Sequence, residues 1–188
     1  MSLAGEFSVL AELALRRMDG TLTLGHTKQI DILALNRATG RTFKLEVKTT
    51  EKSIRGGRKF GASYAWIMDE EHGRVVAPDL IYCFVALRRD AAPKFFLVPS
   101  ADVAAYVRWE YEHSRRWKRR HSPDRPHKVS PMRMFRIPAD GGAHSRVPPS
   151  WRDGRWRRWE DNWSILGPVS RAGRPWAMKA AVRGRRNS

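Results

Sequence analysis

The strongest constraint on the fold of this chain is a pair of strand-like segments separated by a short turn. Residues 30–35 and 42–49 are rich in β-branched and other apolar residues, and residues 36–40 between them read Asn-Arg-Ala-Thr-Gly. Turn-forming residues flanked by two such runs are typical of a β-hairpin. We therefore expect two antiparallel strands here, joined by a tight connection.

The expected hairpin has a consequence for three charged residues. With the turn at 37–40, Asp31 opposes Glu46, and the Cβ atoms of opposed residues lie roughly 5 Å apart. Lys48 follows Glu46 by two positions and so shares its face of the strand. The register therefore predicts two carboxylates and one ammonium group at one end of the hairpin.

This grouping predicts chemistry. Two carboxylates at this separation repel, so one takes up a proton unless a cation lies between them. Mg²⁺ favours such oxygen ligands, lowers the pKa of a bound water and neutralises charge on a phosphate. Lys48 is then suited to orient hydroxide or stabilise the transition state. The alternative interpretation is an ion pair of Asp31 with Lys44 or Lys48, without metal.

Three segments together resemble a known family: Gly5-Glu6, Asp31-Ile32-Leu33 and Leu45-Glu46-Val47-Lys48-Thr49. They look like the PD-(D/E)XK nuclease superfamily, nearest its Holliday-junction-resolvase-like and small uncharacterised endonuclease-like branches. The resemblance covers about residues 4–100 in element order and is specific over 5–49. It departs from the family name at Ile30, which stands where that name has proline. The resemblance implies an α/β fold with a restriction-endonuclease-like three-layer core, in which a mixed sheet is flanked by helices in the order αβββαβ.

The resemblance also implies roles for residues. The metal ligands would be Asp31, Glu46, the backbone carbonyl of Val47 and an acid from the N-terminal helix, and Lys48 would be the catalytic lysine. Glu6 fits the helix acid best, and Glu12 is the alternative. These two glutamates are six residues apart, about 240° around a helix, so both are not expected to reach one metal. Mg²⁺ is the implied cofactor, with Mn²⁺ as its substitute.

Periodicity predicts the remaining elements. A helix over 3–18 has a core-facing stripe formed by Leu3, Phe7, Leu10, Ala14 and Met18, widened by Val9 and Leu13. Strands are expected over 21–24, 80–87, 94–98 and 132–137, a helix over 100–116 and a loop over 51–61. Residues 62–70 fit either a short helix or a strand. This order indicates a mixed sheet flanked by helices.

The positive charge is concentrated in the second half of the chain. Residues 1–112 hold 16 Lys/Arg against 14 Asp/Glu, whereas residues 113–188 hold 20 against 5. A polyanion is the natural partner of such a surface, because Lys and Arg displace counterions from phosphates. We expect DNA as that partner. The residues expected to bind it are Lys52, Arg55, Arg58, Lys59, Arg119 and Arg120.

Three regions are expected: a nuclease-like core over 1–116, a basic extension over 117–166 packed on the core, and a disordered basic tail over 167–188. Four tryptophans mark the extension: Trp151, Trp156, Trp159 and Trp163. Interleaved with arginines, they suit base stacking. Docking on the core as a helical stripe is the favoured interpretation for most of them.

Other functional classes are disfavoured. No apolar run approaches the length of a membrane-spanning helix, and the N-terminus lacks a signal-peptide pattern. The single cysteine, Cys83, lies in an apolar run, which suits a buried thiol and a cytoplasmic location. The leading hypothesis is a DNA endonuclease, as a possible homodimer like resolvase-like proteins. The alternatives are a catalytically inactive nucleic-acid-binding module and an RNA- or ribosome-associated protein.

Overall fold

The computed structural model describes residues 2–23, 30–51, 53–55, 62–89, 91–121, 130–139, 147–151 and 154–168. Its elements follow one another as α1 (Ser2–Leu15), β1 (Met18–Leu22), β2 (Ile32–Asn36), β3 (Arg41–Thr50), β4 (Ser53–Arg55), β5 (Ala62–Asp69), η1 (Glu71–Gly73), β6 (Leu80–Ala86), β7 (Lys94–Pro99), α2 (Ser100–His121), β8 (Met132–Pro138), η2 (Pro149–Trp151), η3 (Arg155–Trp159) and η4 (Trp163–Leu166). Elements marked η are short 3₁₀ helices. No helix in the described ranges is long and apolar enough to cross a membrane.

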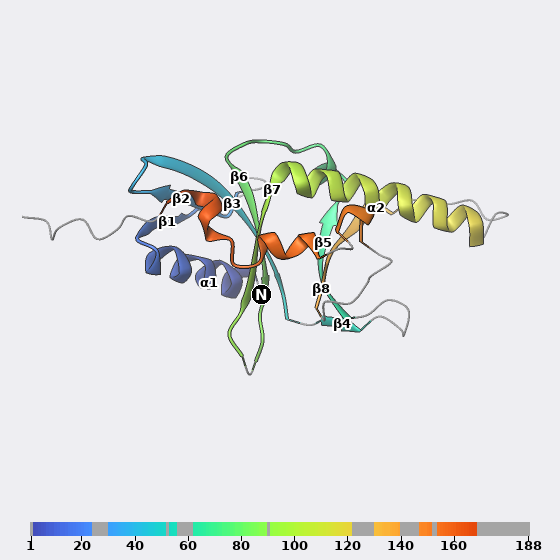
Figure 1. Ribbon diagram of the computed structural model, residues 1–188, viewed down its shortest axis with the longest axis horizontal. Coiled ribbons are helices and arrows are strands. Elements are labelled where there is room, and N and C mark those ends of the chain that lie inside the picture. Colours follow the sequence, from blue (N-terminus) through green and yellow to red (C-terminus); the bar gives the residue numbers. More distant parts are fainter. Residues whose placement is uncertain are drawn as a thin grey trace, which may run out of the picture.

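The central sheet has five strands in the order β1-β2-β3-β6-β7 (Figure 1). β1, β2 and β3 form an antiparallel meander, β6 pairs with β3 in parallel, and β7 returns antiparallel to β6. The expected hairpin register is confirmed, because Leu33 pairs with Lys44 and Leu35 pairs with Thr42. The α/β class and the mixed sheet are confirmed with it.

A second sheet of three strands, in the order β4-β5-β8, lies beside the first. Where the order αβββαβ expects a helix after the third strand, the described chain continues through β4, β5 and η1. Residues 62–69 form a strand because their aromatic and apolar residues pair along their whole length with β8. Trp66, for example, lies opposite Phe135. The described order of elements thus differs from αβββαβ.

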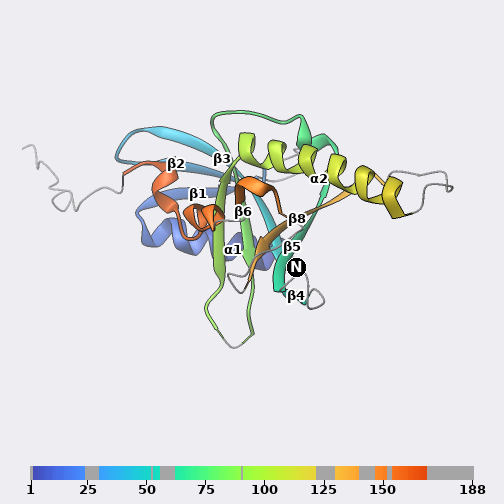
Figure 2. The ribbon, with the colours of Figure 1, turned by 45° about the vertical axis from the view of Figure 1, so that its right-hand side comes forward.

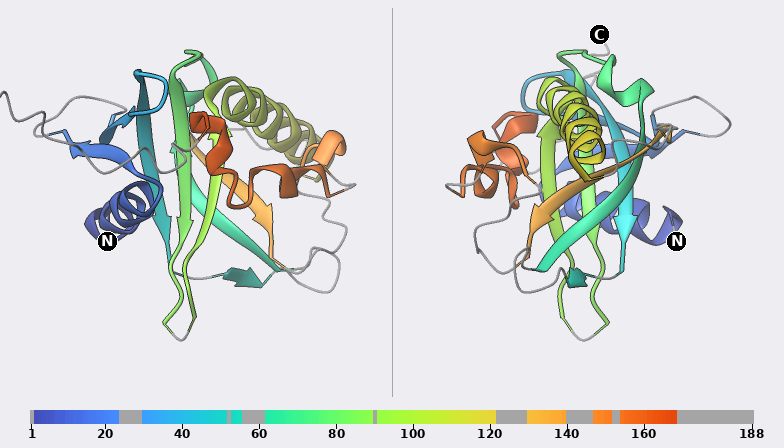
Figure 3. Two further views of the ribbon diagram at one scale, coloured as in Figure 1. Left: turned by 60° about the vertical axis from the view of Figure 1, so that its left-hand side comes forward. Right: turned by 90° about the vertical axis from the view of Figure 1, so that its right-hand side faces the viewer.

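The central sheet separates two hydrophobic cores. α1 covers one face, and α2, β5 and β8 cover the other (Figures 2 and 3). Alternate residues of β6 enter each core: Ile81, Cys83 and Val85 pack on the α1 side, and Tyr82 and Phe84 pack on the α2 side. Because both faces of β6 are buried, its sequence is a continuous apolar run rather than an alternating one.

Trp151, Trp156, Trp159 and Trp163 are buried, so their expected docking is confirmed. They lie on η2, η3 and η4, which are separate 3₁₀ turns and not the single helical stripe that was expected. Trp151, Trp156 and Trp159 join the core on the α2 side, whereas Trp163 joins the core on the α1 side. The segment therefore passes around β7, where Glu160 forms a β-bridge with Phe96 and covers the sheet edge.

The chain is not divided at the expected boundary between 116 and 117. α2 runs through that point to His121, and β8 pairs with β5 of the first region. The described residues of the basic extension thus contribute to the same two cores as the rest of the chain. The expected tail lies outside the described residues from 169 onward.

α1 presents a different face to the sheet from the one its apolar stripe predicts. Val9 and Leu13 are fully buried, but Leu3 and Phe7 are 60% and 57% exposed. The helix instead turns Gly5 toward β3, where a Cβ on this residue would lie 2.0 Å from Thr49 Oγ1. The absence of a side chain at Gly5 therefore allows the helix to approach the sheet closely, and this contact sets the helix rotation.

We predict that Gly5→Ala destabilises the protein by about 1–3 kcal/mol, because the added methyl group overlaps Thr49. In an unobstructed helix the same change stabilises by about 1 kcal/mol, so the sign of the effect reports the contact. Urea unfolding of Gly5→Ala in the wild-type and Thr49→Ala backgrounds measures it. The loss of unfolding free energy caused by Gly5→Ala should be smaller in the Thr49→Ala background. If Gly5→Ala stabilised the protein equally in both backgrounds, α1 would not approach β3 this closely.

Candidate functional site

Asp31 lies immediately before β2, at the point where pairing between β2 and β3 ends. Its carboxylate Oδ2 accepts a hydrogen bond of 2.6 Å from the backbone amide of Val47. The Asp31 carboxylate thus accepts the Val47 hydrogen bond that the backbone of a further strand residue would otherwise accept. Since the N–H and C=O of one residue in an antiparallel strand point to the same edge, the Val47 carbonyl faces the same side as the Asp31 carboxylate.

Glu46 and Lys48 lie on the face of β3 opposite Leu45 and Val47, which pack in the core on the α1 side. Lys48 Nζ is 2.6 Å from Glu46 Oε1. The Glu46 side chain is 4% exposed and that of Lys48 is 29% exposed, so Glu46 is buried while Lys48 reaches the surface. The second carboxylate oxygen, Glu46 Oε2, is buried and makes no hydrogen bond of normal length; the buried Tyr82 hydroxyl interacts with Glu46, which together with burial raises the pKa of Tyr82.

His72, from η1, completes the contacts of Glu46. Its Nε2 lies 3.1 Å from Glu46 Oε1, and its Nδ1 lies 2.7 Å from Asp69 Oδ1. The ring is almost fully buried and packs beside Tyr82. Sequence reasoning missed this histidine. The only local signal is its position three residues after Asp69, and nothing in that spacing points to Glu46.

Of the two candidate helix acids, Glu6 is the one near the hairpin acids. It is 9% exposed, and its charge contributes to raising the pKa of Asp31. Glu12 lies two turns further along α1, where it forms an ion pair with Arg16. The helix rotation set by Gly5 therefore separates two residues that the sequence left as alternatives.

The two hairpin acids have opposite pKa shifts. Burial raises the pKa of Asp31 and is partly offset by the Val47 amide, while the charges of Glu6 and Glu46 raise it further. Burial also acts to raise the pKa of Glu46, but the hydrogen bond from His72 and the charge of Lys48 outweigh it, so its pKa is lowered. Asp31 is thus the acid that more readily takes up a proton.

A pocket of about 480 Å³ opens on the α2 side of β3. Its lining consists of Glu46, Lys48, Asp69, Glu70, Glu71, His72 and Pro131. Four carboxylates against one lysine and one histidine make this pocket acidic. Such a lining favours cations, and a phosphate enters it readily only when a cation offsets the negative charge.

The expected metal ligands fit a cation only in part. Among the residues that the structure describes, no three His, Cys, Asp or Glu side chains meet closely enough to hold a metal ion as they stand. Two features do fit. Glu46 Oε2 is a buried carboxylate oxygen without a hydrogen bond of normal length, and Asp31 lies beside the Val47 carbonyl edge. Mg²⁺ is commonly held by one or two carboxylates, with waters and phosphate oxygens as its other ligands.

The expected DNA-binding residues are placed unevenly. Arg119 and Arg120 lie exposed on the last turn of α2, and Arg55 ends β4. Lys52, Arg58 and Lys59 fall outside the described residues.

Comparisons with protein-family models, with curated proteins and with solved structures give no match for this chain.

We predict that the contribution of His72 to stability falls as the pH rises. Burial lowers its pKa, but Glu46 and Asp69 outweigh burial, so the pKa lies above its ordinary value. The stabilisation is then complete below the pKa of the unfolded chain, about 6.5, and is lost as the pH passes through the folded pKa. In urea unfolding with EDTA, the difference in the free energy of unfolding between wild type and His72→Gln should become smaller from acidic to alkaline pH. A difference that stays constant would contradict the charged contact.

Proposed function

We propose that this chain is a metal-dependent endonuclease that hydrolyses phosphodiester bonds of DNA. The observation that supports this most is the Glu46–Lys48 pair beside an acidic pocket, with Asp31 near enough at the end of the β2–β3 hairpin for Glu46 to raise its pKa. One oxygen of Glu46 is buried without a hydrogen bond of normal length, which is costly unless a ligand or ion satisfies it. The Tyr82 hydroxyl interacts with Glu46, and we infer that a divalent cation supplies the remaining contact.

The residues proposed to hold Mg²⁺ are Asp31, Glu46 and the Val47 carbonyl; Glu6, the acid from α1, is near Asp31 but does not line the pocket of Glu46. When bound, Mg²⁺ lowers the pKa of a water molecule and neutralises charge that develops on the phosphate. Few protein ligands are enough, because bound Mg²⁺ usually keeps several water molecules as ligands. Mn²⁺ has similar ligand preferences and is the expected substitute.

The protein's own groups would position the reactants. Lys48 is partly exposed and its amine reaches the pocket, where it can donate a hydrogen bond to the attacking water or to a phosphate oxygen. His72 holds Glu46 from the other side, and the Val47 amide holds Asp31, so both carboxylates have fixed orientations. Fixed groups of this kind contribute through positioning and electrostatics.

Attraction of DNA would come from outside the acidic pocket. The second half of the chain holds 20 Lys/Arg against 5 Asp/Glu, which supplies a surface for the phosphate backbone. The acidic pocket by itself repels a phosphate until a cation binds. The basic surface is therefore expected to bind DNA without metal, and the metal is expected to be needed for a phosphate to enter the acidic pocket.

A second candidate function is DNA binding without cleavage. Lys48 and His72 both contact the same oxygen of Glu46, and this arrangement satisfies part of the acid without any metal. A site of this kind can be purely structural. The two candidates differ in one measurable property, since only the first turns over DNA when Mg²⁺ or Mn²⁺ is added.

We predict that Lys48→Ala lowers the rate of DNA cleavage by at least about 100-fold, as is usual when a transition-state donor is removed. Lys44→Ala is the matched control. Lys44 also lies on β3 and pairs with Asp79 away from the pocket, so the rate should stay within about twofold of wild type. The assay follows cleavage of duplex, single-stranded and branched DNA with Mg²⁺ or Mn²⁺. Wild-type protein that cuts none of them would rule out the nuclease.

We expect Asp31→Asn to abolish cleavage while Asp19→Asn leaves it intact. Asp31 is held by the Val47 amide and its pKa responds to Glu46 and Lys48, whereas Asp19 forms a surface ion pair with Arg37. Both changes remove one negative charge, so the comparison separates a role in the site from a general effect of charge. In Asp31→Asn, the affinity for Mn²⁺, measured by isothermal titration calorimetry, should fall together with the cleavage rate. Equal cleavage by the two variants would contradict the role of Asp31.

A further inference from the structure

A second pocket, of about 370 Å³, lies between α2 and β8 and differs in charge from the first. Its lining consists of Glu110, Tyr111, Ser114, Arg115, Lys118, Arg119, Ser130, Met132 and Arg133. Four basic side chains face one acidic side chain here. Such a lining favours an anion, which the nuclease site described above does not.

Arg133 is the feature that points to a ligand. Its side chain is only 4% exposed, and its Nη1 donates to the backbone carbonyls of Ser130 and Met132. Its Nε and Nη2 atoms are buried without any hydrogen-bond partner. The nearest acidic oxygens belong to Glu110 at 3.8 Å and Glu70 at 3.7 Å, beyond hydrogen-bond distance.

These two donors are held only in long ion pairs with Glu110 and Glu70, so closer acceptor oxygens would satisfy the buried guanidinium better. A guanidinium presents its donors as a planar fork, which matches two oxygens of a phosphate. Tyr111 packs against the Arg133 guanidinium, with the Cζ atom 4.7 Å from the ring centre, and so holds the fork in place. The pocket is therefore prepared for an anion with several oxygens.

The rest of the lining suits the same ligand. Arg115 and Arg119 are one turn apart on α2, so both face the pocket from the same side of the helix. The serine hydroxyls of Ser114 and Ser130 add polar groups. The one acid, Glu110, already accepts a hydrogen bond from Ser114 through its Oε1.

The two pockets share a wall. Pro131 lines the acidic pocket, whereas its neighbours Ser130 and Met132 line the basic one. Arg133 lies between Glu70 of the acidic pocket and Glu110 of the basic pocket. A ligand that enters one pocket therefore comes close to the other.

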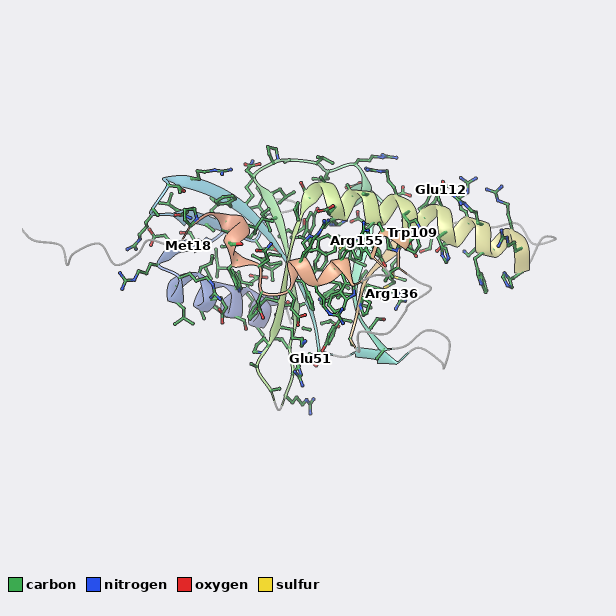
Figure 4. The ribbon with its side chains drawn as sticks, in the orientation of Figure 1. Met18, Glu51, Trp109, Glu112, Arg136 and Arg155 are labelled. Carbon is green, nitrogen blue, oxygen red and sulfur yellow. The ribbon has the colours of Figure 1, made fainter. Side chains whose placement is uncertain are left out.

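We propose that the basic pocket binds a phosphodiester group of the DNA strand whose neighbouring phosphate enters the acidic pocket. The assignment to DNA rests on the proposed nuclease function. A polymer is favoured over a small anion because the positive charge continues along α2, which extends beyond both sheets and carries side chains into solvent past Glu112 (Figure 4). Arg116 and Arg120 are exposed on that same segment.

The test compares two double variants that remove the same amount of charge. Arg115→Gln with Arg119→Gln removes two charges that line the pocket, and Arg88→Gln with Arg116→Gln removes two that do not. All four arginines are exposed, and glutamine keeps the helix propensity close to that of arginine. The probe is a labelled DNA duplex of about 20 base pairs, with binding followed by fluorescence anisotropy in EDTA over a range of salt concentrations.

We expect the pocket variant to lose at least about tenfold in affinity, with a salt slope shallower by about 1, as for one lost phosphate contact. The control variant should lose no more than about threefold, because it removes only diffuse attraction. Equal losses, or no loss in either variant, would overturn the proposal. The proposal would also be overturned if inorganic phosphate bound to wild type and not to the pocket variant while the two had the same affinity for DNA. The site would then bind a free anion.

This experiment is independent of catalysis, because EDTA removes the metal. If the pocket variant loses DNA affinity and wild type does not cleave DNA, the phosphate site is supported and the nuclease function is ruled out. If wild type cleaves DNA and the pocket variant keeps its DNA affinity, the nuclease function is supported and the phosphate site is ruled out. The two proposals therefore fail on different measurements.

Discussion

The parallel pairing of β3 with β6 is the interaction on which the rest of this structure depends. β6 is buried on both faces, whereas β3 beside it packs Phe43, Leu45 and Val47 into the core on the α1 side and turns Glu46 and Lys48 to the other face. Every second residue of β3 consequently points toward α1, and the residues between them point toward α2. Glu46 is carried into the interior by this alternation, although a carboxylate is costly to bury without partners.

The partners of Glu46 come from segments that the sheet brings together. Lys48 follows on the same strand, while His72 arrives from the crossover between β5 and β6, which packs against α2. These contacts lower the pKa of Glu46, and the pKa of nearby Asp31 is raised. An acidic pocket and a basic pocket then lie on either side of residues 130–133. Under our proposals, the first holds a cation and the second holds a phosphate.

Several features were predictable from the sequence because they depend on local pattern. The hairpin register follows from the turn at 37–40, and β2, β3, β6 and β7 follow from their apolar patterns, whereas β1 begins at Met18, which was expected in the helix. The burial of the tryptophans followed from their size and spacing, although their division between two cores did not. Predictions that required knowing which surfaces meet were less successful. The apolar stripe of α1 included Leu3 and Phe7, which are exposed because Gly5 faces the sheet.

The sequence by itself determined that Asp31, Glu46 and Lys48 lie at one end of a hairpin, because a two-residue repeat and a short turn leave one register that suits their pattern. Only the tertiary structure decided that Glu6 and not Glu12 approaches them, that His72 contacts Glu46, and that Arg133 lines a basic pocket next to the acidic one. The reason is physical. Strand pairing within a hairpin is governed by neighbours in the chain, whereas these contacts depend on how closely helices and crossovers pack on the finished sheet.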